Sequence, residues 1–343
     1  MADKTDRRCF LARGIVGAAA VGAAHTSIEE DTLMAAVQEG AAAPARPAAP
    51  KTDIPPGSLP CGKIGKVSMS RLLVGGNLIG GWAHSRDLMY ASKLFQSYNT
   101  EAKVFETLEL CQACGVDTIQ LDPLCWPVVS KYNQSRSTKM QTMVCIPFSD
   151  DKAKTAEAVK RQVDMGATFI YSHGGVTDSF MMNGGKIEAI AQMVELIKAQ
   201  GLPAGVGGHS LNMPVACEKH HVNADFYVKT FHMDRYWSAT PKESRKEYDW
   251  MRASSDHDQN HDSMWCNNPD ETAAFMEKVE KPWVAFKVMA AGAINPNMAF
   301  PFAYRNGADF VIAGMFDFQV EADVKIAINA VRSAANRKRP WRA

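Results

Sequence analysis

The stretch that decides the fold runs from GATFIYSHGG at residues 166–175 to LPAGVGGHSLN at residues 202–212. Each end holds a short apolar run that leads into a histidine next to glycine. Between them, residues 187–201 read IEAIAQMVELIKAQG and place apolar side chains at the i, i+3, i+4, i+7 spacing of an amphipathic helix. Gly201 is a typical helix stop, and Pro203 begins the second apolar run. The stretch therefore predicts a β-α-β unit with a histidine at the carboxyl end of each strand.

Similar apolar runs recur along the chain, and residues 100–114, 151–165 and 323–335 have helical patterns. Strands that alternate with helices in this way are typical of a (β/α)₈ barrel of about 250 residues, whose functional groups lie at the carboxyl ends of the strands. A doubly wound open sheet is the alternative, but no stretch has the fingerprint of its switch point. We therefore predict an α/β fold, a single-domain TIM barrel over residues 61–343. The predicted strands are residues 67–76, 116–121, 140–146, 168–171, 203–206, 224–231, 283–289 and 310–313.

The composition excludes several classes of protein. The chain has 343 residues, of which 46% are hydrophobic and 22% are charged, as in ordinary globular proteins. Its formal net charge of +1 gives no overall field that favours nucleic acid. No apolar run reaches the roughly 18 residues of a membrane-spanning helix. A small molecule is therefore the expected partner, with no nucleic acid and no membrane span in the mature protein.

Residues 1–39 have the pattern of a signal and processing region rather than of a fold. A charged start containing RRCFL at residues 7–11 precedes the weakly apolar GIVGAAAVGAA at residues 14–24. The paired arginines resemble the twin-arginine signal, which implies the twin-arginine export machinery as a partner and a periplasmic or extracellular location. Residues 40–60 are rich in alanine and proline, and we expect an extended linker that packs on nothing.

The longest insertion, residues 233–270, carries several aromatic side chains among many acids. Loops of this length in compact domains are commonly lids or binding loops. We expect a lid over the barrel mouth, with aromatic platforms that suit a polar ring such as a sugar. The predicted substrate contacts are Asn77, His84, Arg86, Trp126, Lys229 and Trp237.

Several titratable side chains stand at or near predicted strand ends. Three histidines on consecutive strands would converge on one mouth, where neutral imidazole is a common ligand of divalent transition metals. A strand-end histidine is also commonly a hydrogen-bonded structural residue. Lys229 and Lys287 are candidate Schiff-base or phosphate-binding lysines, or members of simple ion pairs. The predicted metal ligands are His173, His209, His232 and Asp122.

Six stretches of the chain resemble the aldo/keto reductases. They follow that family's order of barrel strands from the first to the eighth. They are VSMSRLLVGG at residues 67–76, CGVDTIQLD at 114–122, FIYSHGG at 169–175, IKAQGLPAGVGGHS at 197–210, FKVMAAGAI at 286–294 and FVIAGMFDFQVEADV at 310–324.

The resemblance implies a barrel enzyme that acts on a small carbonyl or sugar-like compound. It matches Asp122 and His173 to the family's catalytic aspartate and histidine, which would act here as an acid–base pair. We add His209 and Lys287 to the catalytic candidates because they too stand at or near strand ends.

The chain departs from the family at its tyrosine, its lysine and its phosphate-binding residues. The nearest tyrosine after Asp122 is Tyr132, and the strand that ends in TMVCIPF carries no lysine. Asp317, Glu321 and Asp323 replace the basic residues that hold the cofactor phosphate, and a carboxylate repels a phosphate. These departures disfavour NADP and hydride transfer by the family mechanism.

Three functions follow from these observations. The first is an exported enzyme of aldo/keto reductase ancestry that acts on a small carbonyl or polyhydroxy compound. The second is a metal-dependent lyase or isomerase at the histidine and aspartate site. The third is a sugar-binding barrel that has lost its chemistry.

Overall fold

The computed structural model describes residues 50–85, 88, 90–245 and 266–343. In these residues, eight parallel strands close a barrel in the order β10-β3-β4-β5-β6-β7-β8-β9, which confirms the predicted TIM barrel. Each predicted strand overlaps one barrel strand, and two of them differ from it by three or more residues at one end, as described below. The barrel strands are β3 (Leu72–Gly75), β4 (Thr118–Leu121), β5 (Gln141–Ile146), β6 (Phe169–Ser172), β7 (Ala204–Gly208), β8 (Phe226–Thr230), β9 (Trp283–Phe286) and β10 (Phe310–Ala313).

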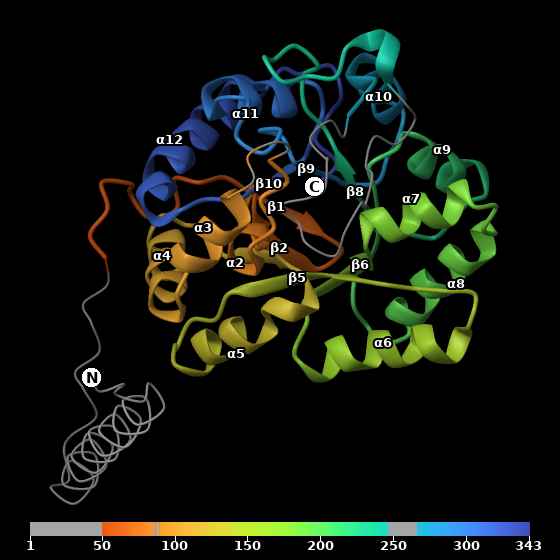
Figure 1. The fold of residues 1–343 in the computed structure, drawn as a ribbon, viewed down its shortest axis with the longest axis horizontal. Helices are drawn as coiled ribbons and strands as arrows, with labels where there is room; N and C mark the ends of the chain where they lie inside the picture. Colours follow the sequence, from red (N-terminus) through yellow and green to blue (C-terminus); the bar gives the residue numbers. More distant parts are fainter. Residues whose placement is uncertain (1–49, 86–87, 89, 246–265) are drawn as a thin grey trace, which may run out of the picture. The chain divides into compact units, whose positions relative to one another are not determined.

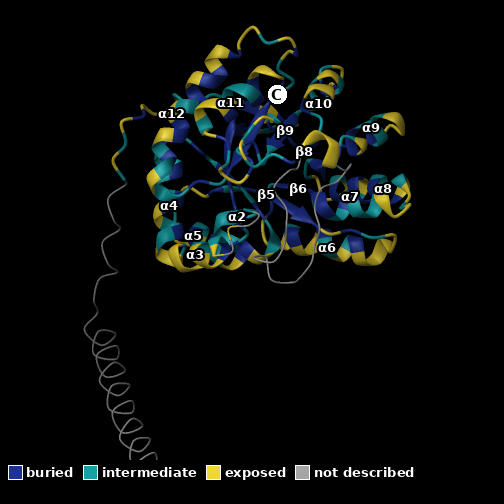
Figure 2. Cartoon of the chain, turned by 45° about the horizontal axis from the view of Figure 1, so that its top comes forward, coloured by how far each residue is buried: buried dark blue, intermediate teal, exposed yellow. Residues whose placement is uncertain are grey.

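Helices surround the barrel, with their exposed faces outward and the buried strands inside (Figures 1 and 2). Ile190, Val194 and Ile197 of the predicted apolar stripe are fully buried, because that face of α8 packs on the strands. The helices are α2 (Asn77–Gly80), α3 (Ala91–Tyr98), α4 (Glu101–Ala113), α5 (Trp126–Gln134), α6 (Lys152–Asp164), α7 (Gly174–Met182), α8 (Ile187–Lys198), α9 (Asn212–Lys219), α10 (Pro269–Met276), α11 (Pro296–Arg305) and α12 (Asp317–Ser333), with short 3₁₀ turns η1 (Pro123–Cys125) and η2 (Lys242–Ser244).

A two-stranded hairpin closes the amino end of the barrel. Its strands β1 (Cys61–Ile64) and β2 (Val67–Ser70) are antiparallel, and β2 leads directly into β3. Ile64 and Met69 are fully buried in the cluster of side chains that fills the barrel interior. The single strand predicted at residues 67–76 is therefore wrong. The chain turns at Arg71, whose guanidinium lies 4.0 Å from the centre of the Trp341 ring.

The residues just before the hairpin pack on the barrel. Ile54 and Leu59 are only 4% and 3% exposed and belong to the main hydrophobic core. The expectation that residues 40–60 pack on nothing is therefore wrong for this part, because two apolar side chains among the prolines are enough to anchor it. Residues 1–39 and most of the predicted lid, residues 246–265, lie outside the described residues. In the described part of the chain, no helix is long and apolar enough to cross a membrane.

Asp309, immediately before β10, is buried and ties the end of the chain to the barrel. Its carboxylate accepts hydrogen bonds from Arg337 at 2.7 Å and from Arg339 at 2.6 Å. It also accepts backbone N–H bonds from Trp283 at 3.0 Å and from Arg342 at 2.9 Å. The side chains of Asp309, Arg337 and Arg339 are almost completely buried, so each charge depends on the others for compensation.

We predict that Asp309→Ala lowers the free energy of unfolding by about 3–5 kcal/mol, because it leaves two buried guanidinium groups without their carboxylate. Urea unfolding followed by circular dichroism measures the change. Glu157→Ala is the control, since the Glu157–Arg161 pair is exposed, with side chains 73% and 68% accessible, and should change stability by less than about 1 kcal/mol. Equal effects of the two substitutions would show that Asp309 does not hold the barrel closed.

Candidate functional site

A cavity of about 520 Å³ opens at the carboxyl ends of the barrel strands, within the size range of small-molecule sites. Its lining combines apolar side chains with a few polar groups that come from different strand ends. This convergence follows from the parallel closed barrel, in which each strand delivers the residue after it to the same mouth. The predicted site residues that line the cavity are Asn77, His84, Asp122, His173, His209 and Lys287.

His173 is both a cavity residue and the N-cap of α7. Its Nδ1 accepts a hydrogen bond from the backbone N–H of Val176, with a donor–acceptor distance of 3.3 Å. Because Nδ1 is the acceptor, the proton of the neutral ring is on Nε2. Burial lowers the pKa of His173, Asp122 opposes that shift, and Lys287 adds to it. His173 is thus a neutral imidazole near pH 7 with a defined tautomer.

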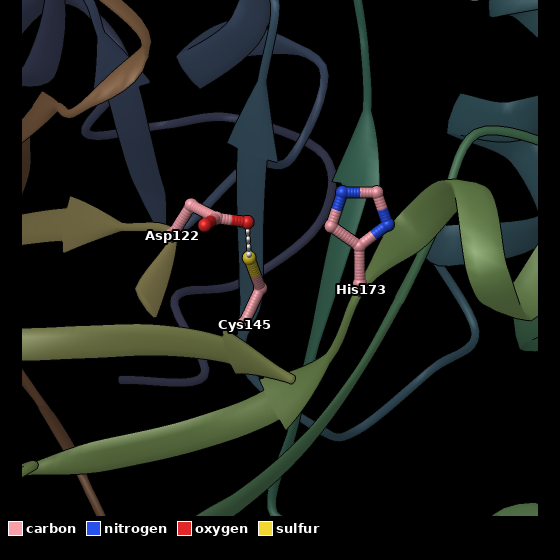
Figure 3. Close-up of side chains that lie close together, drawn as sticks. All are labelled: Asp122, Cys145 and His173. Atoms are coloured by element: carbon pink, nitrogen blue, oxygen red, sulfur yellow. Dashed lines mark hydrogen bonds between the residues drawn. The ribbon is translucent and has the colours of Figure 1, made fainter. Parts of the chain in front are cut away.

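Asp122, Cys145 and His173 come from three consecutive strands and lie together (Figure 3). One ligand-type atom from each lies within 4.8 Å of the others. One oxygen of Asp122 accepts the backbone N–H of Leu124 at 2.9 Å, and the other lies 3.9 Å from the thiol of Cys145. Burial, followed by the charge of Asp122, raises the pKa of Cys145 well above its usual value, so the thiol is protonated at neutral pH. Sequence reasoning missed Cys145, which lies inside β5 rather than after it.

Asp178 on α7 holds the second cavity histidine, His209. Its carboxylate lies 2.8 Å from Nδ1 of His209 and accepts the backbone N–H groups of His209 at 2.6 Å and Ser210 at 3.1 Å. Burial lowers the pKa of His209 well below its usual value. Burial also raises the pKa of Asp178 to about 7, although the two backbone N–H groups oppose that shift. Sequence reasoning also missed Asp178. It could have been noticed as the one charged residue in the stretch GGVTDSFMM, which forms α7.

Backbone strain is concentrated at the cavity. β9 ends at Phe286, not at residue 289 as predicted, because Lys287 adopts a left-handed conformation with φ of 56°. His84 and Ala291, with φ of 52° and 55°, also line the cavity. Left-handed backbone is unfavourable for residues other than glycine, and such strain clusters at binding and catalytic sites. The strain at Lys287 turns the chain at the point where its side chain joins the cavity wall.

Two predicted substrate contacts belong to the scaffold instead of the cavity lining. Trp126 begins α5, is buried, and donates its ring N–H to Gln162 on α6 at 2.7 Å. Lys229 is fully buried within β8 and donates to the backbone carbonyl of Thr230 at 2.8 Å. Both positions correct the sequence-based expectation. The sequence showed which residue types lie near strand ends but not which way these side chains point.

His232 does not line the cavity, and both of its ring nitrogens are engaged by backbone groups. Its Nδ1 lies 2.9 Å from the carbonyl oxygen of Met233, and its Nε2 accepts the N–H of Cys266 at 3.1 Å. The predicted ligand set of three histidines is corrected accordingly, since this ring joins the two ends of the long insertion. Trp237 is 83% exposed and does not line the cavity either. Arg86 lies outside the described residues.

Comparison with known proteins shows the fold. No family model and no curated protein matches the chain. Two solved structures from Pseudomonas aeruginosa, each assigned provisionally to the aldo-keto reductases, are similar. One has 12% identity and a TM-score of 0.52 and covers 79% of this chain and 95% of its own. The other has 13% identity and a TM-score of 0.53 and covers 79% of this chain and 94% of its own. At these identities, the similarity shows a TIM barrel like theirs and not a shared activity.

The buried His232 generates a prediction for the pH dependence of stability. Burial lowers its pKa to about 4, below the value of about 6.5 in the unfolded chain. Its neutral form is therefore favoured in the fold, and stability is lost as pH falls below 6.5, where the unfolded state binds the proton. The free energy of unfolding should fall between pH 7 and pH 5 by about 2 kcal/mol more in the wild type than in His232→Gln, because glutamine does not titrate. Urea unfolding at the two pH values measures this difference. The wild type and the variant have all other titrating groups in common. If their free energies of unfolding fell by the same amount between pH 7 and pH 5, the prediction would be contradicted.

Proposed function

We propose that this chain is an enzyme that moves a proton within a small carbonyl or sugar-like compound bound in the cavity. The observation that carries the proposal is the capping hydrogen bond from Val176 to His173, which assigns the His173 proton to Nε2. The same ring lies beside Asp122, which supplies a carboxylate (Figure 3). A hydrogen-bond donor and a base are thus paired at the barrel mouth.

The pair suits the removal of a proton next to a carbonyl group. The Asp122 carboxylate accepts the proton from carbon, and the electron pair moves toward the carbonyl oxygen as an enediolate forms. His173 donates the Nε2–H hydrogen bond to that oxygen, and a neutral imidazole at a helix N-terminus is suited to this role. Lys287, on the same cavity wall, stabilises the developing negative charge. The substrate's own hydroxyl proton then moves to that oxygen, and Asp122 returns its proton to the neighbouring carbon, which completes an isomerisation.

The start of α12 favours this chemistry over hydride transfer from NADPH. Asp317 stands in the first turn of α12, where the family's phosphate-binding residues would follow the eighth strand. Its carboxylate accepts the hydroxyl of Tyr98 at 2.6 Å and the ammonium group of Lys103 at 3.1 Å. A cofactor phosphate placed here would meet a carboxylate that already holds the nearby cation.

Export remains part of the proposal. It is supported by the paired arginines Arg7 and Arg8 and by the apolar stretch at residues 14–24. The expected location is the periplasm or the extracellular space, reached through the twin-arginine machinery.

We predict that His173→Asn greatly slows proton exchange while it preserves the fold. Asparagine is a good N-cap and can replace the bond to Val176, but it lacks the Nε2–H group. The assay incubates the full chain with hydroxyacetone, dihydroxyacetone or ketoses in D₂O and follows loss of the α-proton signal by NMR. We expect a roughly 10²–10⁴-fold slower exchange, the usual contribution of acid–base catalysis, with an unchanged melting temperature.

Two outcomes would count against the proposal. Exchange by His173→Asn at the wild-type rate would remove His173 from the mechanism. A wild-type protein that binds a sugar but exchanges no proton with any member of the panel would support the sugar-binding hypothesis instead.

A metal-dependent lyase or isomerase is the second candidate, and the grouping of Asp122, Cys145 and His173 favours it. Carboxylate, thiolate and imidazole are a donor set that suits Zn²⁺. The capping bond opposes it. A metal on Nε2 of a neutral ring would require the proton on Nδ1, where the Val176 N–H already points. We therefore rank the metal-free mechanism first.

Cys145→Ser separates the two mechanisms. Under the metal-free mechanism, the full chain carries substoichiometric zinc, and the variant keeps its proton-exchange rate within a few-fold, because serine also offers a hydrogen-bond donor to the Asp122 oxygen that the Cys145 thiol meets. Elemental analysis and the D₂O assay measure these quantities. One zinc per chain in the wild type, lost together with activity in Cys145→Ser, would establish the metal-dependent mechanism.

A further inference from the structure

An aromatic groove lies on α3 and the start of α12, and the proposed function gives it no role. Phe318 is 71% exposed and Leu94 is 64% exposed, and both side chains line the same groove. Contiguous exposed apolar surface on a soluble protein commonly marks a binding site. The residues that line the aromatic groove are Leu94, Phe95, Ser97, Tyr98, Phe316 and Phe318.

The rings of the aromatic groove hold one another in place. Phe316 stacks on Phe318 with 5.4 Å between ring centres and an angle of 9° between the ring planes. The rings of Phe95 and Tyr98 each form a T-shaped pair with Phe316, with ring centres 5.3 Å and 5.4 Å apart. The Tyr98 hydroxyl is fixed by its hydrogen bond to Asp317. Little conformational freedom remains to be lost when a ligand binds, which favours affinity.

The aromatic groove adjoins the cavity. Phe95 and Phe316 line both, so a ligand held in the cavity lies next to the groove. The two sites differ in chemistry. The cavity offers Asp122, His173 and Lys287 to a polar group, whereas the described side chains of the groove are apolar except for Ser97 and Tyr98.

We propose that the aromatic groove binds a flat apolar group, such as a phenyl ring, that belongs to the same molecule as the polar group held in the cavity. This inference rests on the proposed function for the polar part of that molecule. A second sugar ring fits the groove less well, because sugar hydroxyls need several hydrogen-bond partners and the Tyr98 hydroxyl already donates to Asp317. The substrate class is therefore an amphipathic carbonyl compound with an aryl tail.

Matched ligands test the proposal. The affinity of the full chain for hydroxyacetone is compared, by isothermal titration calorimetry, with that for hydroxyketones that carry a phenyl group through one to three methylene spacers. We expect the best phenyl ligand to bind roughly 20-fold more tightly, as six added ring atoms would give. Phe318→Ala and Leu94→Ala should reduce that preference to a few-fold and leave hydroxyacetone binding unchanged. Met182→Ala, an apolar side chain 61% exposed at the end of α7, should keep the full preference.

Equal affinities in the wild type, or a preference that survives Phe318→Ala, would overturn the inference. Benzyl alcohol separates this failure from failure of the proposed function, because it carries the ring without the carbonyl group. If benzyl alcohol binds to the wild type but not to Phe318→Ala, and hydroxyacetone binds to neither, the proposed polar group is refuted and the groove is kept as the site of an apolar ring. Self-association lost in Phe318→Ala, measured by sedimentation, would assign the groove to a second copy of the chain and would also overturn the inference.

Discussion

The carboxylate of Asp309 is the interaction on which the rest of the structure depends. It lies immediately before β10 and joins the last barrel strand to β9 and to the buried arginines of the C-terminal segment. The strand it anchors pairs with β3, with Val311 opposite Leu72, and this pairing closes the barrel. Without closure, the carboxyl ends of the strands would not share one mouth. The cavity therefore depends on barrel closure, which the contacts of Asp309 near the other end of β10 support.

At the mouth, a backbone hydrogen bond decides the chemistry. The start of α7 requires a side-chain acceptor, and His173 supplies it through Nδ1. The requirement is structural, but its effect is to place the proton on Nε2. Burial then keeps the ring neutral at the pH at which it would work. The same residue thus serves the helix with one nitrogen and the cavity with the other.

The polar mouth and the aromatic groove adjoin each other and differ in chemistry. Phe95 and Phe316 line both sites. The cavity has charged and polar side chains, whereas the groove is mostly apolar. Strained backbone at His84, Lys287 and Ala291 surrounds the polar region. Such strain persists only where the surrounding structure enforces it, which fits a scaffold organised around a ligand.

The sequence by itself determined the barrel, since strand and helix periods are local and their alternation leaves few topologies. It also indicated Asp122, His173, His209 and Lys287, because residues at the ends of parallel strands must converge once the sheet closes. Only the tertiary structure decided the remaining features. It turned Lys229 and His232 toward backbone partners and brought Cys145 and Asp178 into the site. The physical reason is that side-chain direction and hydrogen-bond partners depend on barrel register and helix packing, which are set by contacts between residues far apart in the chain.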